Sequence, residues 1–224
     1  LQNQVKETSP DVKATRVTNL ALTLVAVREV AVRENKPFDE AEIEKLFKES
    51  ISILEAQYGA DSDKVSPALN NLAEYYRLNE NYAGAEPLLR RSFDLNKKTL
   101  GESSPKVADS ANDLAILYKE MGKEKESREM YAASLAVREK TPADSADLAT
   151  ALSNMARSYR QEGDFAKSEE LYKRALSMRE KVFGPQSPEV AAILRNYSVL
   201  LKAMGRKPEA RELDKRANAI EATE

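Results

Sequence analysis

The stretch ALNNLAEYYRLNENYAGAEPLLRRSF at residues 68–93 decides the fold, because similar stretches follow it three more times along the chain. The later copies are SANDLAILYKEMGKEKESREMYAASL, ALSNMARSYRQEGDFAKSEELYKRAL and ILRNYSVLLKAMGRKPEARELDKRAN. Equivalent positions lie 42, 41 and 42 residues apart, as in the series Leu72, Leu114, Met155 and Tyr197. A fixed period of this length indicates stacked supersecondary units, so a repeat array is predicted.

Each copy predicts a hairpin of two helices. In its first half, Leu69, Leu72 and Tyr76 recur at helical spacing and form one apolar face. A polar turn follows, and in three copies it contains a glycine, which tolerates the left-handed conformation that ends a helix. In the second helix a small residue recurs where two helices can approach closely: Ala85, Ser127, Ser168 and Ala210. The predicted fold class is therefore all-α, a solenoid of antiparallel helical hairpins.

A serine stands three residues before the first aliphatic residue of each hairpin, at Ser62, Ser104, Ser145 and Ser187. Serine is a favoured N-cap, and proline, which follows two of these serines, is favoured at the first helical position. Ser9-Pro10 has the same form and predicts a fifth, N-terminal hairpin. That hairpin is 11 residues longer than the others, which is about three helical turns. We expect helices at roughly 10–35 and 38–57, or a break inside the first of them.

The last copy suits the end of an array. Asp214 stands where the other copies have Leu89, Tyr131 and Tyr172. A polar outer helix is what a terminal repeat needs for solubility. The predicted organisation is an enlarged N-terminal hairpin at 1–60, then four repeats at 61–224 that end in a polar capping helix, so about five repeats in all.

The composition argues against catalysis and against nucleic-acid binding. The 224 residues include 35 basic and 37 acidic side chains but no His and no Cys. Nucleic-acid binders usually carry a basic excess, because phosphate contacts dominate their affinity. Nothing marks a catalytic site, and Glu169 and Glu170 are interpreted as solvated charges on a helix surface. We predict no enzyme activity, no catalytic residue, no cofactor and no bound metal.

The most apolar run, NLALTLVAV at residues 19–27, is too short to span a bilayer. We therefore expect a soluble, cytoplasmic protein without a membrane span. Because the chain begins at Leu1 and not at Met, an exported and processed protein is the alternative.

Several stretches resemble the kinesin-light-chain type of tetratricopeptide repeat. They are LNNLAEYY, AEPLLRRSF, ELYKRALSMREKVFG and SPEVA, and the resemblance covers about residues 38–221. It implies a right-handed superhelix in which the first helices line a concave groove that binds extended peptides. The family usually has histidine before the proline of the inter-repeat loop, whereas this chain has Ser104 and Ser187, and no heptad coiled coil precedes the repeats. Motor cargo binding is therefore not carried over.

The first helix of each hairpin also carries polar side chains away from its core face. An asparagine column, interrupted by Asp113, comprises Asn71, Asn154 and Asn196, and Asn70 and Asn112 stand at the neighbouring register. These amides could donate to and accept from a peptide backbone. A cationic set comprises Arg77, Lys119, Arg157, Arg160, Arg195 and Lys202. The alternatives are asparagines that bond to neighbouring helices and a solvated charged face. We predict a mixed groove that becomes more positive toward its C-terminal end.

These patterns predict a scaffold or adaptor that binds an extended peptide or a partner protein, with an acidic segment of the partner near Arg157, Arg160 and Arg195. The alternative is a structural subunit of a larger assembly, or a module that self-associates through its N-terminal hairpin or convex face. Apolar residues on more than one face of the first helix support that alternative: Leu20, Leu22, Leu24, Val25, Val27, Val30 and Val32. An RNA-binding helical repeat is disfavoured because the aromatics stand at core registers.

Overall fold

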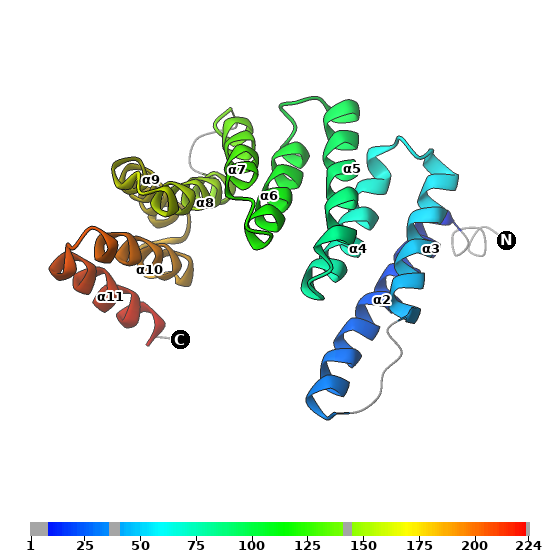
Figure 1. Cartoon of the computed structure of the whole chain (residues 1–224), viewed down its shortest axis with the longest axis horizontal. Coiled ribbons are helices and arrows are strands. Elements are labelled where there is room, and N and C mark those ends of the chain that lie inside the picture. The colour runs from blue at the N-terminus through cyan, green and yellow to red at the C-terminus, as the bar shows by residue number, and fades with distance from the viewer. Residues whose placement is uncertain (1–8, 36–40, 141–144, 223–224) are drawn as a thin grey trace. The chain divides into compact units, whose positions relative to one another are not determined.

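The computed structural model describes residues 9–35, 41–140 and 145–222, and within them every regular element is helical. The α-helices are α2 (Pro10–Arg33), α3 (Ala41–Tyr58), α4 (Ser66–Leu78), α5 (Tyr82–Leu100), α6 (Pro105–Glu120), α7 (Glu124–Arg138), α8 (Ala146–Glu162), α9 (Phe165–Phe183), α10 (Pro188–Ala203) and α11 (Lys207–Glu221), with a 3₁₀ turn, η1 (Asp63–Val65), before α4. These elements form five successive helix pairs in the described part of the chain (Figure 1). The all-α fold class and the number of repeats are confirmed.

The chain divides into two compact units after Leu117, within α6. In the first unit α2 packs against α3 and α4 packs against α5. In the second unit α8 packs against α9 and α10 packs against α11. Each pair is joined by a short connection, so its helices run antiparallel. The right-handed superhelix and the boundary at residue 60 stay predictions.

The N-terminal hairpin is enlarged as expected. α2 runs without a break from Pro10 to Arg33, which excludes the alternative of an interrupted first helix. Residues 36–40 and the side chain of Val32 lie outside the described part of the structure. The apolar face of α3 supplies Ile43, Leu46 and Phe47 to a core that α2 and α4 share.

The predicted caps form at several helix starts. The side-chain oxygens of Ser145 and Ser187 accept hydrogen bonds from the backbone N–H groups of Leu148 and Val190. Ser62 caps the 3₁₀ turn and not α4, which therefore begins three residues later than the other hairpins suggest. At the other end of α8, Gly163 has a φ of 82°, the left-handed conformation that lets the chain turn into α9.

The small-residue register lies where paired helices touch. Ala85, Ser127, Ser168 and Ala210 are all buried. The Ser168 hydroxyl of α9 donates to the Ala156 carbonyl oxygen of α8 at 2.7 Å, which shows how closely the two backbones approach. A larger side chain would separate the helices, and this explains why the register holds only alanine or serine.

In the described residues, no helix combines the length and the apolar character that crossing a bilayer would require.

Candidate functional site

The first helices of the hairpins carry the predicted site residues, and in the first unit they line a cleft. We call it the amide cleft. It has a volume of about 360 Å³ and is lined by Asn70, Asn71, Glu74, Arg77, Leu89, Asp113 and Ile116. The Arg77 guanidinium donates two hydrogen bonds of 2.7 Å to the Glu74 carboxylate, so its charge is already countered. The cleft therefore offers a ligand amide and carboxylate oxygens, but Arg77 is not available as a cation.

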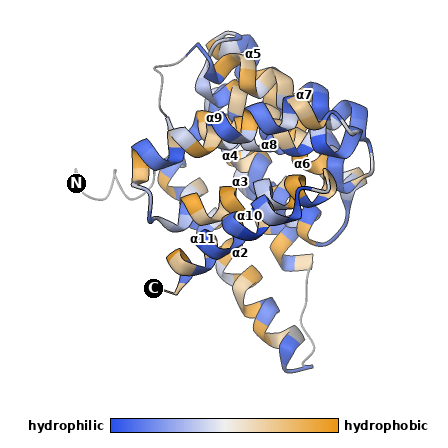
Figure 2. Ribbon diagram, turned by 90° about the vertical axis from the view of Figure 1, so that its left-hand side faces the viewer, coloured by the Kyte–Doolittle hydropathy of each residue, from blue (hydrophilic) through white to orange (hydrophobic). Residues whose placement is uncertain are grey.

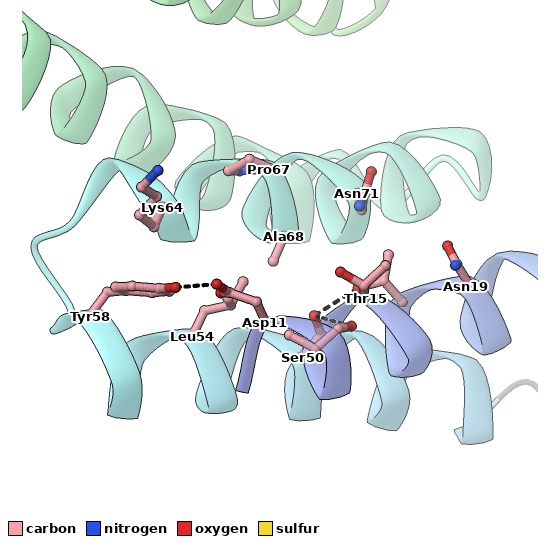
Figure 3. A pocket seen from close by; sticks show the side chains of 12 residues that line it. Asp11, Thr15, Asn19, Ser50, Leu54, Tyr58, Lys64, Pro67, Ala68 and Asn71 are labelled. Carbon is pink, nitrogen blue, oxygen red and sulfur yellow. Dashed lines mark hydrogen bonds between the residues drawn. The ribbon is translucent and has the colours of Figure 1, made fainter. Parts of the chain in front are cut away.

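A second cleft of about 380 Å³ lies between α2 and α4, with α3 on one side. Figure 3 shows Asn71 of α4 facing Thr15 and Asn19 of α2 across it. The Tyr58 hydroxyl donates to the Asp11 carboxylate at 2.5 Å at one end. Asn71 thus lines both clefts.

The amide cleft has an excess of negative charge. The pKa of the Asp113 carboxyl is raised to about 6, first by burial and then by the carboxylates of Asp109 and Glu74. Arg77 and a hydrogen bond with Asn112 act in the opposite direction but do not compensate. A group at this cleft that carries positive charge would relieve the cost of ionising Asp113.

The second unit contains the opposite arrangement, which we call the cation cluster: Lys119 at the end of α6 with Arg157 and Arg160 on α8. Burial is the first cause of the lowered pKa of Lys119, and the charge of Arg157 is the second. The Arg157 Nη2 donates to the Tyr131 hydroxyl at 3.2 Å, while its Nε is buried without an acceptor. In the described part of the chain, none of the three cations is ion-paired to a carboxylate.

The C-terminal cations behave differently from the cation cluster. Arg195 is bound to the Glu221 carboxylate and Lys202 to the Asp214 carboxylate, at 2.5 and 2.7 Å. Both acids lie on α11, and the pKa of Asp214 is lowered chiefly by its bond with Lys202. The polar last helix therefore neutralises this end of the array. The expected rise in positive charge stops at Arg160 and does not extend to Arg195.

The interpretation of Glu169 as a solvated surface charge is wrong. Its side chain is only 14% exposed, and its oxygens accept from the Tyr197 hydroxyl at 2.7 Å and from Arg206 at 2.6 Å. Lys173, Tyr197 and Arg206 together lower the pKa of Glu169 to about 2 despite its burial. The residue ties α9 to α10 and to the start of α11, so its role is structural.

The asparagine column is not uniform. Asn70 has a buried side-chain oxygen without a partner, whereas Asn154 accepts weakly from Arg157 at 3.5 Å. Asn112 also has an interaction within the chain, and Asn196 is half-buried. Sequence reasoning missed Asn96, which is 3% exposed and also has an orphan oxygen. The signal was an irregularity, because the equivalent positions hold Arg138 and Arg179.

A family model described as tetratricopeptide repeat matches residues 38–98, 64–140 and 147–220. The chain belongs to the tetratricopeptide repeat family. Members of this family generally mediate protein–protein interaction or scaffolding. No curated protein matches the sequence.

Solved structures agree with the tetratricopeptide repeat fold. A kinesin-light-chain-like protein of Podosopora anserina with nearly identical TPR-like repeats aligns with a TM-score of 0.77 at 21% identity, over 96% of this chain and 98% of that chain. BtubC (BKLC) from P. vanneervenii aligns with a TM-score of 0.77 at 22% identity, over 93% and 82% of the two chains. MamA is more distant, with a TM-score of 0.56 at 16% identity, over 84% and 97%. At these identities the likeness concerns the fold alone.

Proposed function

We propose that this tetratricopeptide repeat chain is a scaffold or adaptor that holds a partner protein through an extended segment lying along the first helices of its hairpins. An acidic group of that segment docks on the cation cluster. The polar residues of the first helices predicted from the sequence form the contact surface, with Arg195 and Lys202 excluded as anion ligands because α11 already neutralises them.

The observation that carries the proposal is the cation cluster without carboxylate partners. Three positive side chains lie together at partly buried positions, and the buried Nε of Arg157 has no acceptor. Such an arrangement costs free energy in the isolated protein, because like charges repel and a buried donor stays unsatisfied. A carboxylate of the partner would relieve the repulsion among the three cations through charge-assisted hydrogen bonds. Glu120 and Glu124 moderate the potential at Lys119 but only partly offset it.

The test is a fluorescence anisotropy titration of the full chain with labelled 12-residue peptides that are acidic, neutral or basic. We expect the acidic peptides to bind most tightly. The variant Arg157→Ala/Arg160→Ala should lose at least about tenfold in affinity, because each charge-assisted bond is worth about 1.5–3 kcal/mol.

The matched control is Lys125→Ala/Arg211→Ala, which removes the same charge from exposed positions on the second helices α7 and α11. It should bind the acidic peptides as the wild type does. Equal affinity for all three peptide classes, or equal losses in both double variants, would overturn the proposal.

A second candidate function, self-association, is favoured by the apolar surface of α2. Leu20, Val27 and Val30 are each about half exposed. Because they lie within about 80° of one another around the helix axis, they form one apolar stripe. Figure 2 shows hydrophobic segments along α2, and Figure 1 shows α2 lying beside its hairpin partner α3. A contiguous apolar stripe on a surface marks an interaction site.

The occupant that fits this stripe is a second copy of α2, packed antiparallel. A two-fold axis at the level of residue 25 places Leu20 opposite Val30 of the second copy. The same axis places Thr23 opposite Val27, and the Thr23 hydroxyl is already bonded to the Asn19 carbonyl oxygen, so it brings no unsatisfied donor into the contact. It also places the basic Arg16 opposite the acidic Glu34 at each end, which gives charge complementarity.

Sedimentation analysis over a range of protein concentrations tests self-association. Leu20→Glu/Val27→Glu should shift the chain to monomer. Leu22→Glu is the control, because Leu22 is similarly exposed but lies about 200° around the helix from Leu20. A wild-type chain that is monomeric at every concentration would contradict this candidate and leave the stripe to another occupant.

A further inference from the structure

A pocket formed by α7, α8 and α9 is lined mostly by apolar side chains. We call it the alanine pocket. It has a volume of about 300 Å³, and its apolar lining consists of Ala132, Leu135 and Ala136 of α7, Met155 and Tyr159 of α8, and Leu171 of α9. All of these residues belong to the second unit. The pocket therefore lies mainly on second helices of hairpins, whereas the cation cluster lies on first helices.

Two alanines of α7 distinguish this place from the other hairpins. The positions equivalent to Ala132 hold Arg90, Lys173 and Lys215. The positions equivalent to Ala136 hold Asp94, Ser177 and Ala219. Ala132 and Ala136 are both exposed and lie four residues apart, so they share one face of α7. Because both side chains end at Cβ, they leave the half-buried ring of Tyr159 and the half-buried Leu135 within reach of a ligand.

Three charged side chains also line the alanine pocket, and two of them are already paired. Lys167 is bound to Asp164 at 2.7 Å, and Glu139 is bound to Arg174 at 2.9 Å. Glu170 is exposed and, among the residues that the structure describes, has no cation bound to its carboxylate. The pocket therefore presents apolar walls and one carboxylate that can accept a hydrogen bond from a ligand.

We propose that the alanine pocket docks a tryptophan side chain of a partner protein. Its volume is about twice the roughly 150 Å³ of an apolar cavity that binds benzene, so a two-ring indole fits it better than a smaller side chain. An indole is apolar except for one N–H group, which can only donate, and the Glu170 carboxylate is an acceptor for that group. Met155 and Tyr159 favour an aromatic ligand through sulfur–ring and ring–ring contacts.

Other occupants fit less well. A leucine side chain fills only part of the volume and brings no donor for Glu170. A lysine pairs with Glu170, but its thin alkyl chain covers less of the apolar wall than a ring does. A second copy of the chain cannot supply the occupant, because the sequence contains no tryptophan. The inference goes beyond the proposed function, since docking here does not require the cation cluster.

Because the chain has no tryptophan, indole fluorescence in a binding assay comes only from the probe. The probe is a short neutral peptide with one central tryptophan, excited where tyrosine does not absorb, and the full chain is titrated into it. We expect a saturable blue shift of the emission as the indole leaves water. Peptides with leucine or lysine in place of the tryptophan should displace the probe at least about tenfold less well.

Three outcomes of this titration would overturn the inference. One is the absence of a saturable shift. Another is displacement by the leucine or the lysine peptide as effective as displacement by unlabelled tryptophan peptide. The third is a shift with N-acetyl-tryptophan amide but none with the peptide, because a pocket that admits only the free amino-acid derivative does not dock a protein.

Matched variants locate the binding site. Ala136→Lys places a long charged side chain in the pocket and should weaken binding of the tryptophan peptide at least about tenfold. Ala219→Lys is the control, because Ala219 stands at the same register in the last hairpin. Both alanines are exposed, so neither change enlarges a core side chain. Equal binding by the two variants would contradict the inference.

The hydrogen bond to Glu170 is tested separately. Glu170→Gln should weaken binding of the tryptophan peptide several-fold, whereas Glu129→Gln, an exposed position at the same register one hairpin earlier, should not. A peptide with 1-methyltryptophan keeps the aromatic ring but lacks the donor, so the wild type should bind it several-fold more weakly. The inference fails if the wild type binds both peptides equally, or if Glu170→Gln and Glu129→Gln bind the tryptophan peptide equally.

Discussion

Glu169→Gln removes the charge that holds α9, α10 and α11 together. In the folded protein the pKa of Glu169 is about 2, compared with an ordinary value of 4.5. A shift of that size corresponds to roughly 3 kcal/mol. Arg206 and Lys173 are a third or more exposed, so solvent screening reduces the contribution to about 1–2 kcal/mol.

The sign of the pH dependence follows from the lowered pKa. The contribution of Glu169 is fully present above its ordinary pKa of 4.5 and is lost as the pH falls toward 2, because the carboxyl must then be protonated in both states. Glu169→Gln should therefore lower the free energy of unfolding by about 1–2 kcal/mol at pH 7 and by much less near pH 2.5.

The assay is urea unfolding followed by far-ultraviolet circular dichroism at several pH values. Glu170→Gln is the matched control, because Glu170 is the adjacent, exposed carboxylate on the same helix. It should be neutral at every pH. The reasoning is refuted if Glu169→Gln is as stable as the wild type at pH 7, or if its deficit does not shrink as the pH falls.

Two further changes test the packing and the electrostatics. Ser168→Val enlarges a fully buried side chain and removes its hydrogen bond to the Ala156 carbonyl oxygen. It should lower the free energy of unfolding by about 1–3 kcal/mol in a urea titration. Ser177→Val, at an exposed position on the same helix, is the control and should be nearly neutral. The pKa of Asp113 is raised from 3.8 to about 6, so its ionisation costs stability as the pH rises through this range. Asp113→Asn should therefore raise the free energy of unfolding by up to about 2 kcal/mol at pH 7. This gain should vanish below pH 4 in the same titration.

The helices could be predicted from the sequence because their signals are local. Ser145 and Ser187 cap the helices that they precede, and Gly163 adopts the conformation that ends one. The apolar spacing around Leu72 and the small residue at Ser168 identified the core face and the close helix contact. Each of these features depends on residues within one hairpin, where the repeat pattern determines which faces of the two helices pack together.

The candidate site could be predicted only in part, because pairing between hairpins is not local. Lys202 stands at the same register as the available cations Lys119 and Arg160, yet the acids of α11 neutralise it together with Arg195. Glu169 reads as an exposed helix charge, but two later segments bring Tyr197 and Arg206 onto it. The alanine pocket is formed mainly by second helices, whereas every site residue predicted from the sequence lies on a first helix.

The central claim is that the cation cluster binds an acidic group of a protein ligand. The most direct measurement is the dissociation constant of one labelled acidic peptide at low and high salt, for the wild type and for Arg157→Ala/Arg160→Ala. We expect the wild-type affinity to fall steeply as salt increases, because ions screen the contact, and we expect the variant to bind weakly with little dependence on salt. A variant with unchanged affinity and an unchanged salt dependence would contradict the claim.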